Sequence, residues 1–236
     1  MRLALALLLV LAACGRPLTE AERALLAPIH GPSLDTAPIR IQSSPTVGVF
    51  PITYPARPRT TCRERIGPPP KTDVITGRTA GIVLFQRLFL RPDIARPDWA
   101  ALDPAPEGSD EPPALNLAAA MFFVHEMTHV WQWQNRAVTG YHPSKAFSEH
   151  LTTDDPYLLD GEGTARFLDY GYEQQATLVE EYLCCATLDP DGARTARLHA
   201  LVGQALPVAP PRSFPRDVWL PEGGDDPATI CSDPAG

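Results

Sequence analysis

Residues 114–136 (ALNLAAAMFFVHEMTHVWQWQNR) contain neither proline nor glycine, in a chain of 236 residues that has 27 prolines and 16 glycines. The run is rich in Ala and begins directly after two prolines, which predicts a long helix. Asn116 can cap the start of this helix, and Gly140 lies just past its end. The rest of the fold must pack around this element.

The spacing of side chains along this run predicts which face is buried. Residues three and four apart share one face of a helix. The stripe that we expect in the core consists of Met121, Val124, Thr128 and Trp131. The adjacent stripe, which we expect to face a cleft, consists of His125, His129 and Gln132.

Residues 125–129 (HEMTH) have the pattern H-E-x-x-H. On a helix, His125 and His129 can bind one metal ion, while Glu126, about 100° around the axis, can reach a metal-bound water. These residue types at this spacing indicate a hydrolytic zinc site. The alternative is that both are ordinary half-buried histidines on an amphipathic helix.

A catalytic zinc ion needs a third protein ligand and an open position for water. Gln132 and Asn135 stand where the metzincin pattern has Gly and His, so that arrangement is excluded. A second predicted helix, Tyr172–Leu188, opens with Glu173, and Ala176 one turn later allows a close approach of two helices. Residues 173–176 (EQQA) look like the E-x-x-A segment with which gluzincin peptidases supply a glutamate ligand, and this resemblance implies that Glu173 is the third ligand.

Other side chains between the two predicted helices compete for this position, and Glu173 could instead be a solvated carboxylate at a helix N-terminus. The competitors are His142, His150, Asp154, Asp155, Asp160, Glu162 and Asp169. The resemblance to the aspzincin pattern is weak, because Arg166 occupies the position of the aspartate that binds the metal in that pattern.

The blocks HEMTHVWQ and YGYEQQA resemble gluzincin-type zinc metallopeptidases, and more narrowly a bacterial group of Vgr-related peptidases without an assigned substrate. The resemblance spans roughly residues 72–188. It implies an α+β, zincin-like fold in which the active-site helix packs on a small sheet and a second helix carries a ligand. It also implies one Zn²⁺ ion on His125, His129 and Glu173, with Glu126 as the general base in the hydrolysis of a peptide or protein substrate.

The sequence departs from the gluzincin pattern at Thr177, where many members carry an aspartate that orients a ligand histidine. A different residue must therefore orient the ligand histidine in this protein. An oxyanion donor is also needed, and the candidates are Tyr157, Tyr170, Tyr172, His142 and His150. A second interpretation is a non-catalytic zinc-binding envelope lipoprotein that recognises a protein partner, and hydrolysis of a non-peptide amide would use the same site.

Residues 72–90 predict two strands upstream of the long helix. We expect a turn around Thr76-Gly77-Arg78 and a second strand over residues 81–85. In zincins such a strand lies at the sheet edge above the cleft, where an extended substrate can add to it.

The N-terminus carries an export signal. Residues 1–13 have one positive charge and a short apolar stretch, and Leu11-Ala12-Ala13-Cys14 resembles a bacterial lipobox. This implies lipid on Cys14 and anchoring to the outer membrane, with the protein facing the periplasm. The net charge of −8 argues against nucleic acid as a partner.

Proline usage suggests a division of the exported chain. We expect a Pro-rich tether over residues 14–70, one zincin-like domain over residues 71–206 and a Pro-rich tail over residues 207–236. An oxidising compartment permits disulfides among Cys62, Cys184, Cys185 and Cys231. A vicinal bridge is strained, so we expect Cys62 and Cys231 each to reach one member of the adjacent pair. Free thiols are the alternative.

Overall fold

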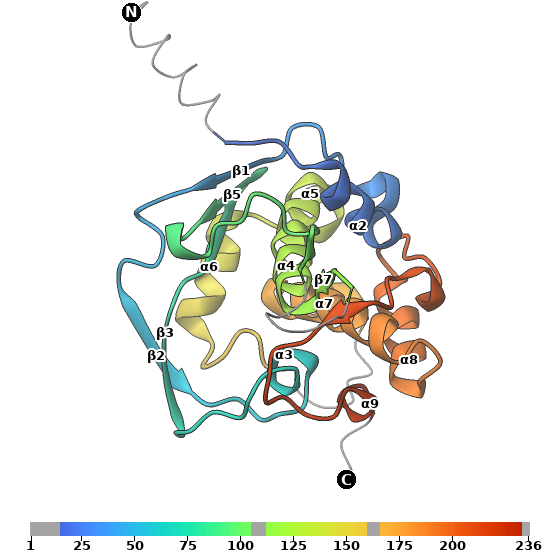
Figure 1. Ribbon diagram of the computed structural model, residues 1–236. Coiled ribbons are helices and arrows are strands. Elements are labelled where there is room, and N and C mark those ends of the chain that lie inside the picture. Colours follow the sequence, from blue (N-terminus) through green and yellow to red (C-terminus); the bar gives the residue numbers. More distant parts are fainter. Residues whose placement is uncertain (1–14, 105–111, 160–165, 233–236) are drawn as a thin grey trace, which may run out of the picture.

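The computed structural model describes residues 15–104, 112–159 and 166–232. The fold is mixed α+β, as expected from the sequence, with helices packed around small sheets. Figure 1 shows helix α4 in the middle of the molecule, with α2, α7 and α8 around it. The α-helices are α2 (Glu20–His30), α3 (Cys62–Arg65), α4 (Leu117–Gln134), α5 (Arg136–Thr139), α6 (Pro143–Thr152), α7 (Tyr172–Leu188), α8 (Ala193–Val202) and α9 (Pro227–Ile230).

Within the described ranges the strands form three small sheets. Their members are β1 (Arg40–Ser43), β2 (Pro51–Pro55), β3 (Val74–Arg78), β4 (Gly81–Leu84), β5 (Arg87–Leu90), β6 (Leu102–Asp103), β7 (Ala114–Asn116) and β8 (Val218–Trp219). The first sheet has the order β1-β5-β4, with β1 parallel and β4 antiparallel to β5. Strands β2 and β3 form an antiparallel pair, and β7 lies between β6 and β8. Strand β4 is therefore an edge strand.

The two long helices follow the sequence-based prediction closely. Helix α7 has the predicted bounds, and the Asn116 side chain caps α4 by accepting a hydrogen bond from the Ala119 amide. Residues 114–116, which open the predicted run, pair with β6 and β8, and α4 begins directly after its cap at Asn116. It is also buried almost all round: not only the predicted stripe but also His125, Glu126 and His129 are under 9% exposed.

The predicted turn around Gly77 is wrong. Strand β3 continues through it, because Thr76 and Gly77 pair with Thr53 and Ile52 of β2, a strand that the sequence analysis did not predict. Only Thr79 and Ala80 separate β3 from β4, which belongs to a different sheet. Helix α4 packs against β4 and α7, which places the sheet edge beside the helix that carries HEMTH.

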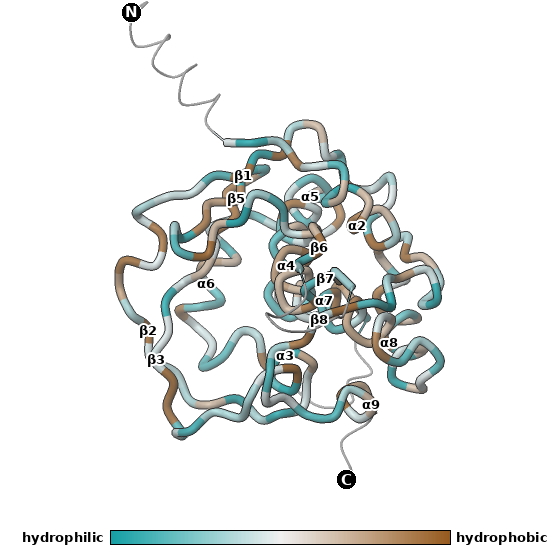
Figure 2. The backbone as a smooth tube through the Cα atoms, viewed as in Figure 1, coloured by the Kyte–Doolittle hydropathy of each residue, from teal (hydrophilic) through white to brown (hydrophobic). Residues whose placement is uncertain are grey.

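The division into tether, domain and tail is corrected by the packing. Leu26 and Ile29 of α2 and Ile230 of α9 are buried in the same core as α4 and α7. Figure 2 shows hydrophobic residues, in brown, along α4 and along β5, with which β1 from the N-terminal part of the chain pairs. From residue 15 to residue 232 the described chain thus shares one core, although it is rich in proline. Cys14 lies outside the described residues.

No helix within the described ranges is both long and apolar enough to cross a membrane.

Candidate metal centre

Helices α4 and α7 bring His125, His129 and Glu173 together. The Nε2 atoms of His125 and His129 lie 3.1 Å and 3.2 Å from the same oxygen, Oε2 of Glu173. The potential ligand atoms of all three residues lie within 4.8 Å of one another. Ligand atoms about 2.0–2.1 Å from a tetrahedral zinc ion are about 3.3 Å apart, so two imidazoles and one carboxylate at this spacing fit a zinc ion.

Local structure explains this convergence. The two histidines are one helical turn apart on α4, and Glu173 lies in the first turn of α7. Ala176, one turn further along α7, is completely buried, and its small side chain lets the helices approach closely. The sequence-predicted third ligand therefore lies where the two histidines need it.

The charges of the site favour a cation. Burial lowers the pKa of His125, but its contacts with Glu173 and Glu180 outweigh burial and raise that pKa to about 9. Burial raises the pKa of Glu173, but His129, His125 and His150 together bring it well below its usual value. A buried, ionised carboxylate among three imidazoles attracts positive charge, and protons and metal ions compete for it.

The Nδ1 atoms of His125 and His129, the ring nitrogens that do not face Glu173, each lie near a side-chain oxygen. His129 Nδ1 lies 2.8 Å from Oε1 of Gln132, whose amide group already donates to the Tyr172 carbonyl and to Gln175. Oε1 must therefore accept, so the proton of His129 is on Nδ1 and Nε2 is free to bind a metal. Nδ1 of His125 lies 3.1 Å from Oε2 of Glu180.

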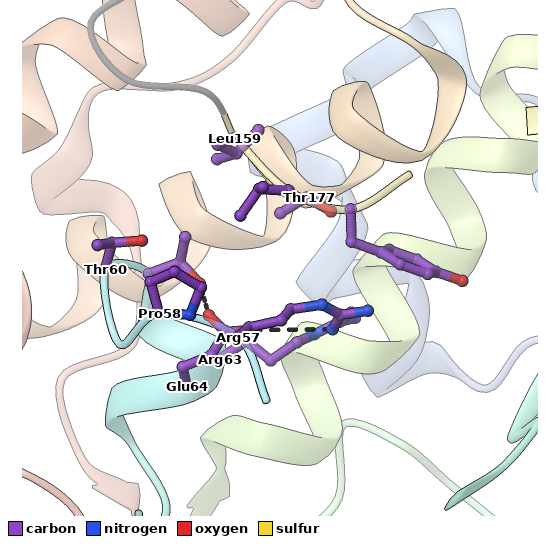
Figure 3. Close-up of a pocket in the computed structure, with 10 residues that line it drawn as sticks. Arg57, Pro58, Thr60, Arg63, Glu64, Leu159 and Thr177 are labelled. Carbon is purple, nitrogen blue, oxygen red and sulfur yellow. Dashed lines mark hydrogen bonds and ion pairs between the residues drawn. The ribbon is translucent and has the colours of Figure 1, made fainter. Parts of the chain in front are cut away.

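Thr177, where gluzincins carry an orienting aspartate, does not take that role. Its hydroxyl is buried and has no hydrogen-bond partner among the described residues. It lines a cavity of about 10 Å³, opposite Arg57 and Arg63 in Figure 3. This space holds one water molecule at most. The carboxylate near His125 Nδ1 is instead that of Glu180, three residues further along α7, at 3.1 Å but without the alignment of a hydrogen bond.

Most of the competing ligands lie elsewhere. Asp154 is exposed, Asp155 pairs with Arg57, and Asp169 pairs with Arg166. His142 caps α6 through the Ser144 amide. Asp160 and Glu162 lie outside the described residues. The exception is His150 of α6, whose Nε2 is 3.0 Å from Oε1 of Glu173, the oxygen that does not face the other histidines.

Glu126 lies between α4 and the edge strand β4. Its side chain is 7% exposed, and its carboxylate lies against Gly81. Burial raises the pKa of Glu126, with opposing effects from His125 and His129. A carboxylate of raised basicity beside the ligand histidines is suited to accept a proton from water.

Of the five residues considered as oxyanion donors, the structure brings two to the site. The Tyr157 ring is 5.8 Å from the His125 ring and 5.5 Å from the His150 ring, and Arg57 lies over its face. Burial, followed by the charge of Glu173, raises the pKa of Tyr157 well above its usual value, so its hydroxyl remains a donor. Within the described ranges, Tyr170, Tyr172 and His142 make no hydrogen bond, ion pair or ring contact with His125, His129 or Glu173.

Sequence reasoning missed Tyr141. This buried side chain stacks on His129 with ring centroids 6.0 Å apart, and burial raises its pKa. No spacing rule connects it to HEMTH, since it follows the turn at Gly140, where α5 ends. Glu180 was also missed, although its position seven residues after Glu173 places it on the same face of α7.

Two disulfides attach distant segments to α7. Cys62 of α3 pairs with Cys184, and Cys185 pairs with Cys231, directly after α9. Each distant cysteine thus reaches one member of the adjacent pair. The first bridge places α3, and with it Arg63, beside the helix that carries Glu173.

Comparisons with known proteins add little. No known protein family matches the chain. No curated protein matches it either. Among solved structures, the chain is similar to the effector domain of Pseudomonas aeruginosa VgrG2b, with 21% identity and a TM-score of 0.49 over 83% of this chain and 86% of that one. That structure is a Vgr-related effector domain.

Proposed function

We propose that this protein is a zinc-dependent metallopeptidase. The observation that carries the proposal is the meeting of His125 Nε2 and His129 Nε2 at one oxygen of Glu173, with Glu126 next to the first ligand on the same helix. Two neutral imidazoles and one carboxylate leave a tetrahedral ion one position for water, which is the arrangement of a catalytic site.

Each residue has a distinct role in peptide hydrolysis. When bound, zinc would acidify water and polarise the scissile carbonyl. Glu126 accepts the proton from the attacking water and returns it to the leaving amine. Tyr157, whose ring lies beside that of His125, is the donor suited to stabilise the oxyanion, since Nε2 of His150 already contacts Glu173.

The substrate side of the proposal rests on strand β4. It is an edge strand, and Ile82 and Leu84 are 41% and 43% exposed. An extended peptide can pair with this edge through its main chain, and Gly81 at its start lies against Glu126. A peptide bound there would run past the general base.

We also propose that the protein is exported and that lipid on Cys14 anchors it to the outer membrane, facing the periplasm. The two disulfides support an oxidising compartment. Labelling of cells with a radioactive fatty acid tests this, because Cys14→Ser must abolish incorporation into the protein.

The activity is tested with the purified protein and its Glu126→Gln variant on a peptide library, with zinc content measured in both. We expect equal zinc content and a loss of cleavage of about 10²–10⁴-fold in the variant. Zinc in both proteins without Glu126-dependent cleavage would instead support a zinc-binding lipoprotein that recognises a partner.

A further inference from the structure

Glu180 joins the metal centre to α3. Its side chain is 1% exposed, and its Oε2 atom lies 3.1 Å from His125 Nδ1 and 2.9 Å from Nη2 of Arg63. His125 Nδ1 is buried and makes no well-aligned hydrogen bond within the described ranges, and Glu180 Oε2 is the acceptor that lies within reach of it. One carboxylate oxygen is thus shared by a ligand imidazole and a guanidinium group.

We propose that Glu180 and Arg63 are positioning residues of the metal centre: Glu180 fixes the ring orientation and tautomer of His125, and Arg63 holds Glu180 in place and compensates its buried charge. This inference rests on the proposed function, because it assumes that a metal ion binds His125 Nε2.

The chemistry of imidazole supports this role. A histidine that binds a metal through Nε2 carries its proton on Nδ1 and needs an acceptor there. For His129 the acceptor is Gln132, from its own helix. For His125 it is Glu180, from the helix that supplies Glu173, so α7 contacts both nitrogens of the same ring.

Burial explains the need for Arg63. An unpaired carboxylate at this depth would cost several kcal/mol in desolvation. Arg63 provides the opposite charge from α3, and its guanidinium also lies 5.4 Å from the centre of the Tyr157 ring. Glu180 and Arg63 therefore form a chain of contacts that leads from the ligand His125 to α3.

The neighbouring residues provide matched controls. Glu181 is also buried, on the same helix, but it pairs with Arg194 and accepts a hydrogen bond from the Cys62 amide. Arg65, two residues after Arg63 on α3, pairs with Asp225. Within the described ranges, neither control residue forms a hydrogen bond or ion pair with His125 or His129.

The test measures zinc affinity by competition with a chromophoric chelator. The proteins are the wild type, Glu180→Gln, Arg63→Met and the controls Glu181→Gln and Arg65→Met. Thermal unfolding of each zinc-free protein reports stability, and the visible spectrum of the Co²⁺-loaded protein reports ligand geometry. We expect about 10–100-fold weaker zinc binding and an altered Co²⁺ spectrum for Glu180→Gln and Arg63→Met. Both controls should bind zinc as the wild type does, even where they unfold at lower temperature.

Wild-type zinc affinity in Glu180→Gln and Arg63→Met would overturn the inference and leave the proposed function standing. If Glu180→Gln fails to fold, Arg63→Met decides alone, since it keeps the carboxylate and removes only its partner. A wild-type protein that binds no zinc would refute the metal centre itself, and this inference with it.

Discussion

Gly81 of β4 leaves room for the carboxylate of Glu126: a β-carbon at this glycine would lie 3.1 Å from Oε1. The same atom would be 3.1 Å from side-chain carbons of Leu88 and Phe122, which belong to the core around the site. The proposed general base therefore has its position because the neighbouring strand carries no side chain there.

Gly81→Ala should displace the Glu126 carboxylate by a few tenths of an ångström. We expect peptide cleavage to fall about tenfold, since small misplacements of catalytic groups are costly, with zinc content unchanged. The matched control is Gly77→Ala on β3, where the nearest contact would be an ordinary 3.4 Å to the Tyr54 hydroxyl. Equal cleavage rates in the two variants would contradict the role assigned to this close approach.

His150→Ala should weaken zinc binding about tenfold, because it removes the group that holds the second oxygen of Glu173. The control is His142→Ala, which changes a histidine that caps the same helix without touching the ligands. Chelator competition gives both affinities. Loss of cleavage at unchanged zinc affinity would assign His150 to substrate or oxyanion binding instead.

Removing either disulfide should lower the free energy of unfolding by about 2–4 kcal/mol, as measured by urea denaturation. Only the double variant Cys62→Ser/Cys184→Ser loosens α3, so only this variant should also bind zinc more weakly. Cys185→Ser/Cys231→Ser releases α9 and serves as the control. The same zinc affinity in both double variants would show that α3 stays in place without its bridge.

Acid should destabilise the protein through His30. Burial lowers the pKa of this completely buried histidine from 6.5 to about 3. Its Nε2 lies 3.2 Å from the Thr128 hydroxyl, which itself donates to the Val124 carbonyl, so the ring is neutral and donates from Nε2.

Between pH 6.5 and 3 the unfolded chain therefore binds a proton at His30 that the folded protein does not, and stability falls with decreasing pH. His30→Gln should reduce the loss of unfolding free energy between pH 7 and pH 5 by about 2 kcal/mol. Urea titrations of both proteins at these two pH values measure it. An unchanged pH dependence in the variant would show that other groups are responsible.

The central pair of helices could be predicted because its signals are local. An uninterrupted apolar run predicted α4, and the spacing of HEMTH predicted which side chains share a face. Glu173 was selected because residues 173–176 resemble the E-x-x-A segment of gluzincin peptidases, and the structure brings it to both histidines. Glu180 also has a local signal, its seven-residue spacing from Glu173, but a family pattern directed attention to Thr177.

Other parts of the fold depend on contacts between distant residues. Proline content suggested a tether where α2 and β1 are integral to the core, although Thr19 and Glu22 already have the spacing of a capping box. Strand β1 pairs in parallel with β5, more than 40 residues later, and a short sequence run cannot show such a partner. Tyr141 likewise reaches His129 only through the turn after α5.

Because Cys184 and Cys185 are adjacent, the two disulfides close consecutive rings that span 122 and 46 residues. A single backbone cut inside either ring leaves the fragments covalently joined. Self-cleavage of a peptidase at one loop between Cys62 and Cys231 would then leave its mass on a non-reducing gel unchanged, and smaller bands would separate only after reduction. The protein with such a nick would still hold His125 and Glu173 on connected chains.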